Sequence, residues 1–316
     1  MDAIIICICI CWSLSEANRA SACAASDARE EGNDMSKPVY ITVDSTSDIP
    51  PELCERFQIK VAPLHVHLGE DEYLDGVNFN QDMIYERYAK DKTLPRTSAV
   101  TPQEFLAFFS PLVEAGYEVV HLDISSELSG TYQNAVIAAQ ELEGVHPIDT
   151  RSLTNGITQM AIHACRLRDE GKDAETIVQA MQELIPKANV SFVLDTLEYM
   201  WKGGRCSGVT AFGANLLNLK PCIEMRDGKL EVIKKYRGNI HKVYDKYITE
   251  RISGRKIRPE FIFISSEPAM EEDLKAHLTE LVKSLVPVNE LIFTRLSCTV
   301  TSHSGPGTLG ILFLDE

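Results

Sequence analysis

The apolar residues along the chain follow two alternating spacings. From Pro38 onward, short runs rich in Val, Ile and Phe alternate with longer segments in which apolar residues recur every three or four positions. The short runs predict buried strands, and the longer segments predict amphipathic helices. Regular alternation of the two is typical of an α/β protein.

The first half of this pattern predicts a doubly wound, mostly parallel sheet with flanking helices. Thr101, Pro102 and Glu104 mark one helix start, because Thr can cap the helix, Pro suits its first turn and Glu completes a capping box. Strands are expected at 39–43, 60–68, 119–124 and 145–149, and helices after Pro51 and at 101–112, 131–142, 155–168 and 173–186.

Strands dominate the second half, after about Lys187. Asp227-Gly228 is a hairpin dipeptide that joins two of them. We expect a mixed or antiparallel α/β sheet with helices on one side, and a two-domain chain divided into residues 37–188 and 189–316. Strands are expected at 190–194, 221–226, 229–236, 260–265, 290–296 and 308–314, and helices at 239–252 and 270–285.

Residues 1–36 differ in composition from the rest of the chain. The apolar, Cys-rich run from Ala3 to Trp12 is too short to span a bilayer as a helix. Asp2 precedes it without any Lys or Arg, which is the wrong flank for a signal peptide. We predict that residues 1–36 are a non-native start, a disordered segment or a targeting segment, with Met35 as the preferred start and a signal peptide as the alternative.

Composition narrows the partners and the compartment. The net charge of −15 argues against nucleic acid or an anionic membrane as a standing partner, because both require clustered Lys and Arg. None of the nine cysteines forms a C-x-x-C pair. We therefore predict reduced, mostly buried thiols in a cytoplasmic protein.

Four polar segments lie where ligand sites gather in α/β proteins, after a strand or before a helix. Ser129 and Gly130 precede a predicted helix, whose free N–H groups favour a carboxylate or a phosphate; the alternative is that Ser129 only caps that helix. Arg205 is either a planar anion donor or part of a surface turn. The segments are Thr97-Ser98, Ser125–Thr131, Lys202–Arg205 and His303–Gly310.

Known catalytic motifs give little support for an enzyme. The G-x-G-x-x-G from Gly305 leaves no room for the helix and acidic residue that a dinucleotide site needs. There is no G-x-S-x-G, Walker A or H-E-x-x-H motif, and no histidine base can be assigned to a serine. The aspartates that follow strands lack metal-ligand spacing, so no metal site is predicted; they are Asp44, Asp48, Asp123 and Asp149.

Taken in order, the motifs from about Lys37 to the C-terminus resemble those of the DegV family, the fatty-acid-binding proteins that serve bacterial fatty acid kinase. They are D-S-T-S-D-I-P from Asp44, T-S-x-x-T-P from Thr97, S-x-L-S-G-T-Y-Q-x-A from Ser126, D-T-R from Asp149, K-G-G-R from Lys202, L-K-P from Leu219 and H-x-G-P-G from His303.

This resemblance implies two α/β domains and an apolar tunnel for a long acyl chain. It implies that Thr97 and Ser129 hold the carboxylate, with Arg205 and His303 nearby; Ser98, Gly130 and Thr131 belong to the same predicted ligand site. It also implies a non-catalytic lipid carrier without a cofactor, whose ligand is the fatty acid.

The implied partner is an ATP-dependent fatty acid kinase, which makes an acyl-phosphate for phospholipid synthesis. Transient membrane contact is compatible with this role. A basic group is the candidate surface for the kinase, or else a solvated face: Lys234, Lys235, Arg237 and Lys242. The alternatives are a serine-dependent acyltransferase or hydrolase using Ser129 or Ser98, and a binder of a small phosphorylated ligand.

Overall fold

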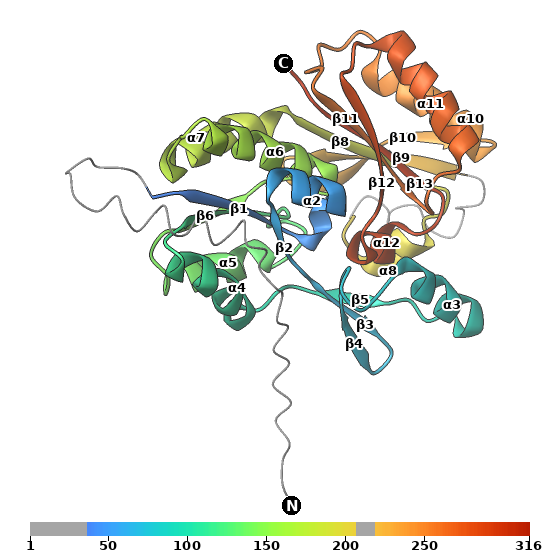
Figure 1. Ribbon diagram of the computed structural model, residues 1–316. Coiled ribbons are helices and arrows are strands. Elements are labelled where there is room, and N and C mark those ends of the chain that lie inside the picture. Colours follow the sequence, from blue (N-terminus) through green and yellow to red (C-terminus); the bar gives the residue numbers. More distant parts are fainter. Residues whose placement is uncertain (1–36, 207–218) are drawn as a thin grey trace, which may run out of the picture. The chain divides into compact units, whose positions relative to one another are not determined.

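The computed structural model describes residues 37–206 and 219–316. The predictions for residues 1–36 lie outside this part. In the part described, no helix is both long and apolar enough to cross a membrane. The chain is an α/β protein built on one parallel and one mixed sheet (Figure 1).

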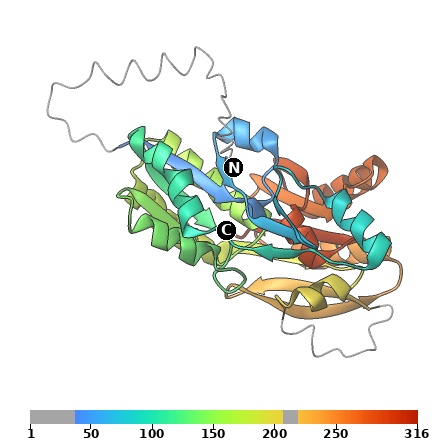
Figure 2. The ribbon, with the colours of Figure 1, turned by 90° about the horizontal axis from the view of Figure 1, so that it is seen from below.

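The first sheet is parallel throughout, with strand order β2-β1-β6-β7. Helices α6 and α7 pack on one face, while α4 and α5 pack on the other (Figures 1 and 2). The predicted capping box is present at α4, where Thr101 Oγ1 accepts from Glu104 N–H. The elements are β1 Val39–Asp44, β2 Lys60–Ala62, β6 Glu118–Asp123, β7 Val145–Asp149, α2 Pro51–Phe57, α4 Pro102–Glu114, α5 Thr131–Ala139, α6 Asn155–Asp169 and α7 Ala174–Leu184.

The second sheet has six strands in the order β10-β9-β8-β13-β11-β12. It is mixed, because β11 and β12 are parallel and the other pairs are antiparallel. Helices α10 and α11 pack on one face. The elements are β8 Ala188–Val193, β9 Leu219–Arg226, β10 Lys229–Arg237, β11 Phe261–Glu267, β12 Glu290–Arg295, β13 Thr308–Leu314, α10 Ile240–Ile252 and α11 Glu272–Leu285.

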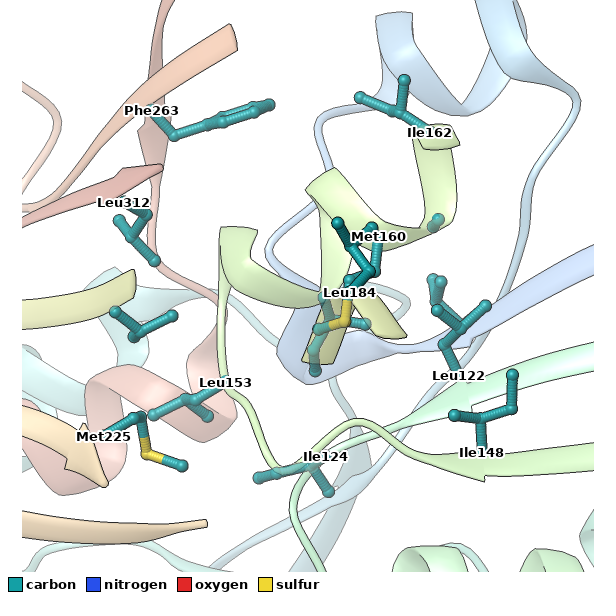
Figure 3. Close-up of a cluster of buried hydrophobic side chains, with 14 of the residues drawn as sticks. Leu122, Ile124, Ile148, Leu153, Met160, Ile162, Leu184, Met225, Phe263 and Leu312 are labelled. Atoms are coloured by element: carbon teal, nitrogen blue, oxygen red, sulfur yellow. The ribbon is translucent and has the colours of Figure 1, made fainter. Parts of the chain in front are cut away.

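Helix α6 covers the other face of this second sheet. Met160 of α6 lies in one apolar cluster with Phe263 and Leu312 of the second sheet and with Leu122 of the first (Figure 3). The expectation of helices on one side only was therefore wrong. The central strands β11 and β13 are buried at every position, and a strand buried on both faces needs cover on both. The division at residue 188 stays a prediction.

Three helices were missed by the sequence analysis, and the structure also has a small antiparallel sheet. The two shortest of these helices, α8 and α12, have too few turns to show a helical period in the sequence. As a result, Lys202 and Gly203 were expected in a loop but end α8, and His303 lies in α12. An antiparallel sheet has the order β4-β3-β5. The elements are α3 Gln81–Asp91, α8 Glu198–Gly203, α12 Cys298–Ser304, β3 His65–Leu68, β4 Asp71–Leu74 and β5 Arg96–Ser98.

The predicted burial is confirmed for Cys165, Cys206, Cys222 and Cys298, whereas Cys54 is only half-buried. Burial raises the pKa of Cys165 and of Cys222 to about 12, so both are protonated at neutral pH.

Candidate functional site

A cavity of about 360 Å³ lies at the carboxyl ends of the parallel strands. Thr46 follows β1, Ile124 follows β6 and Leu153 follows β7, and all three line the cavity. The second sheet contributes Phe192 and Leu230 to the opposite wall. The site thus occupies the edge of the sheet where ligands of open α/β proteins bind.

The cavity has an apolar wall and a cluster of hydroxyl groups. Such a lining suits a ligand with a long apolar part and one small polar group. The apolar residues are Leu64, Ile124, Leu128, Leu153, Phe192, Met200, Leu230 and Val300. The hydroxyl residues are Thr46, Thr97, Ser98, Ser126, Ser129, Thr299 and Ser304.

Six of the seven predicted site residues line this one cavity: Thr97, Ser98, Ser129, Gly130, Arg205 and His303. Thr131 does not line it. Its side chain is buried, and its Oγ1 lies 2.7 Å from Ser129 Oγ. Thr131 therefore orients Ser129 and does not face the cavity. Gly130 occupies the N-cap position of α5, and Ser129 Oγ accepts from Thr131 N–H at 3.3 Å, so Ser129 also satisfies one donor of the first helical turn.

Thr97 and His303 both line the cavity and form a hydrogen-bonded pair. His303 Nε2 lies 2.8 Å from Thr97 Oγ1. Burial, together with the nearby Arg205 charge, lowers the pKa of His303 to about 4, so the ring is neutral at pH 7. In the tautomer protonated at Nε2, His303 donates to Thr97 and leaves the Thr97 hydroxyl proton for a ligand.

Gly203 is required by the position of the His303 ring. A Cβ at residue 203 would lie 2.3 Å from His303 Nδ1. Gly305, which follows α12, has φ +73° and packs against the Tyr199 ring, so a side chain there would be strained as well as crowded. The K-G-G-R and H-x-G-P-G motifs therefore allow α8 and α12 to approach closely.

Asp149 and the β9–β10 hairpin hold the loop that carries Ser129. The Asp149 carboxylate accepts from Ser126 N–H at 3.1 Å and from Ser126 O–H at 2.5 Å. Ser125 Oγ donates to Gly228 O at 2.7 Å. Gly228 has φ +79°, and a Cβ there would lie 2.6 Å from Ser125 Oγ. The Asp227-Gly228 turn therefore both reverses the strand and supports the loop.

Asp75, which the sequence analysis missed, anchors helix α12. Its buried carboxylate accepts from Cys298 N–H at 2.9 Å and from Thr299 N–H at 3.0 Å. Asp75 lies after β4, far from α12 in the sequence, so no local pattern could have paired them. It fixes the helix that carries His303.

The aspartates that follow strands act as hydrogen-bond acceptors. Asp44 accepts from Thr46 N–H at 2.7 Å and from Ile124 N–H at 2.6 Å, and thereby holds two cavity residues that the sequence analysis did not select. Burial raises the pKa of Asp44 to about 6, with a further contribution from the charge of Asp123. In residues 37–206 and 219–316, no group of three His, Cys, Asp or Glu side chains could hold a metal ion.

One serine of the cavity has a histidine partner. Ser98 Oγ lies 2.8 Å from His67 Nε2. Ser129, by contrast, is bonded to Thr131, and His303 is bonded to Thr97. Of the two serines, Ser98 therefore has the arrangement closer to a nucleophile and its base.

Comparison with known proteins identifies the family. The sequence model of the protein family described as "uncharacterised protein, DegV family" matches residues 38–316 of this chain. The chain belongs to the DegV family.

Individual DegV relatives match nearly from end to end. A DegV domain-containing protein of Clostridium acetobutylicum is 31% identical over 280 residues, which cover 88% of this chain and 99% of that one. A protein of Thermotoga maritima named fatty acid-binding protein is 30% identical, and the match covers 86% of this chain and 96% of that one. A solved structure, described as fatty acid binding of a DegV family protein from Thermus thermophilus, is 32% identical in sequence and has a TM-score of 0.79. The match covers 88% of this chain and 100% of that one.

Proposed function

We propose that this DegV protein binds a long-chain fatty acid, with the acyl tail against the apolar wall and the carboxylate at Thr97 and Ser129. The observation that carries the proposal is the cavity itself, which combines an apolar wall with the Thr97 hydroxyl, bonded to a neutral histidine, and the Ser129 hydroxyl, bonded to Thr131. The fatty acid binding described for the Thermus and Thermotoga relatives supports it.

The apolar wall accounts for most of the expected affinity. Each buried CH₂ contributes about 0.8 kcal/mol, so a long tail outweighs any one polar contact. Neutral hydroxyls can orient the carboxylate without forming a fully buried ion pair, whose desolvation is costly. Arg205 is exposed and adds a screened attraction at the mouth.

His303 would act through Thr97. With Nε2 protonated, the imidazole donates to Thr97 Oγ1, and the Thr97 hydroxyl then donates to the carboxylate. A charged His303 would form a buried ion pair with the ligand, but its low pKa keeps it neutral. The role of His303 is therefore to orient the Thr97 hydroxyl as a donor to the carboxylate.

The proposal extends to a carrier that works in the cytoplasm without a cofactor and presents the carboxylate to an ATP-dependent fatty acid kinase for phospholipid synthesis. The exposed positions of Ser98, Gly130 and Arg205 favour this role, because they leave the polar end of the site open to a partner. Acyl-phosphate should form from ATP only when kinase and loaded protein are both present.

The direct test is native mass spectrometry of the purified protein, followed by denaturing extraction. We expect one long-chain fatty acid per chain, either co-purified or taken up on addition. A protein that is empty and takes up no fatty acid would contradict the proposal.

A serine-dependent acyltransferase or hydrolase is the second candidate, and the contact between Ser98 and His67 favours it. Stoichiometric labelling by a fluorophosphonate, lost in Ser98→Ala but kept in Ser129→Ala, would establish that activity. Absence of labelling in the native protein would exclude Ser98 as an activated nucleophile.

A further inference from the structure

A second hollow, of about 430 Å³, lies where strand β10 leads into helix α10. It shares no lining residue with the fatty acid cavity. Five of its lining residues are basic, although the chain as a whole carries a net charge of −15. They are Lys234, Lys235, Arg237, Lys242 and Lys246.

A β-bulge directs part of this basic group toward α10. The register of β10 against β9 shifts between Val232 and Lys234. Before the shift, Leu230 and Val232 pack in the cluster around α6; after it, Tyr236 packs in the cluster under α10. A bulge inserts one residue and so turns the following side chains to the other face. Lys234 therefore lies on the same face as Tyr236, next to α10.

Two ammonium groups converge on one aromatic ring in this hollow. Lys234 Nζ lies 5.3 Å and Lys246 Nζ 6.0 Å from the centroid of the Tyr236 ring, which is buried. Glu250 accepts from Lys234 Nζ at 2.7 Å and from the Tyr236 hydroxyl at 2.6 Å. The Glu250 carboxylate of α10 thus contacts Lys234, one of the five basic residues that line the hollow.

The N-terminus of α10 adds positive potential at the same place. Helix α10 has 13 residues and is capped by Asn239, whose Oδ1 accepts from His241 N–H at 3.0 Å. Arg237 precedes the helix closely, and Lys242 lies in its first turn. Cations at this end oppose the helix dipole, so their position costs free energy unless an anion is bound.

We propose that this hollow is a binding site for a phosphate group. A phosphate carries up to two negative charges and several acceptor oxygens, so it can bind several lysines and the Arg237 guanidinium at once. A single carboxylate would satisfy fewer of them. The phosphate can belong to a soluble phosphoester or to a lipid headgroup, since both present the same oxygens.

The test compares the double variant Lys242→Gln, Lys246→Gln with the control Lys256→Gln, Lys283→Gln, which removes two exposed lysines that do not line the hollow. Titration calorimetry with inorganic phosphate, against chloride at equal ionic strength, measures the soluble source. Sedimentation with phosphatidylcholine vesicles, with and without phosphatidylglycerol, measures the lipid source. Fatty acid uptake and circular dichroism verify the fold; if the double variant unfolds, Lys246→Gln alone replaces it.

We expect phosphate or phosphatidylglycerol vesicles to bind the native protein, and binding to weaken by up to about 5-fold for each lysine removed. The control variant should bind like the native protein. Failure of both ligands to bind would overturn the proposal, as would equal weakening in the two double variants. Because fatty acid uptake is measured separately, this failure is distinct from failure of the fatty acid site.

Discussion

Replacing Thr97 by Val tests the proposed carboxylate site most directly. The substitution keeps the branched shape but removes the hydroxyl that lies 2.8 Å from His303 Nε2. A hydrogen bond to a charged group contributes about 1.5–3 kcal/mol, so the dissociation constant for a fatty acid should rise by about 10- to 150-fold. Thr97 is half-buried, which places the expected effect nearer the lower figure.

The assay is fluorescence displacement by a fatty acid and by the alcohol of equal chain length. The alcohol buries the same tail but lacks the charge, so Thr97→Val should weaken alcohol binding much less than acid binding. Thr97→Ser retains the hydroxyl and is the matched control, with an affinity expected close to that of the native protein.

Two results would refute this reasoning. Unchanged fatty acid affinity in Thr97→Val would show that Thr97 does not bind the carboxylate. Equal losses for acid and alcohol would show that the hydroxyl only maintains the shape of the cavity through His303. Circular dichroism and thermal unfolding identify a variant that has simply lost its fold.

Three further predictions concern the cavity and the buried charges. Gly203→Ala should displace the His303 ring, because the added methyl would lie 2.3 Å from Nδ1, and should weaken fatty acid binding about 10-fold. Gly204→Ala has open space and should not move the ring, although its φ of +68° makes the backbone strained, so thermal unfolding is measured for both variants. Phe192→Ala should join the main cavity to a small void of about 20 Å³, because Phe192 lines both. Competition between fatty acids should then show a preference for longer chains, by about 0.8 kcal/mol for each added CH₂. An unchanged chain-length preference would exclude Phe192 as the boundary of the tail site. The folded protein binds the Asp44 proton more tightly than the unfolded chain, since the pKa of Asp44 is raised to about 6. The protonated group therefore stabilises the fold by about 3 kcal/mol below about pH 4, and this stabilisation is lost as pH rises through 6. Urea titrations should show that Asp44→Asn lacks this loss; a pH dependence equal to that of the native protein would refute it.

The alternation of strands and helices was predictable from the sequence, because it rests on local patterns. The capping box at Thr101 and the hairpin at Asp227-Gly228 are also local, and both are present. The loop position of Ser129 followed from the same patterns, since such loops meet at the carboxyl ends of parallel strands. Thr97, in contrast, lies in the short strand β5. The proximity of both residues to Arg205 and His303 came from resemblance, not from spacing.

Other features depended on contacts between residues far apart in the chain. Helix α6 covers the second sheet because β11 and β13 are buried on both faces, and the apolar pattern of a helix does not say which sheets it will meet. Asp75 reaches α12 across more than two hundred residues, which no local rule encodes. Thr131 was predicted to face the ligand, but its helix turns it toward Ser129. Local periodicity determined the elements, whereas side-chain orientation was decided by packing in the tertiary structure, where burial favours one arrangement over many with the same pattern.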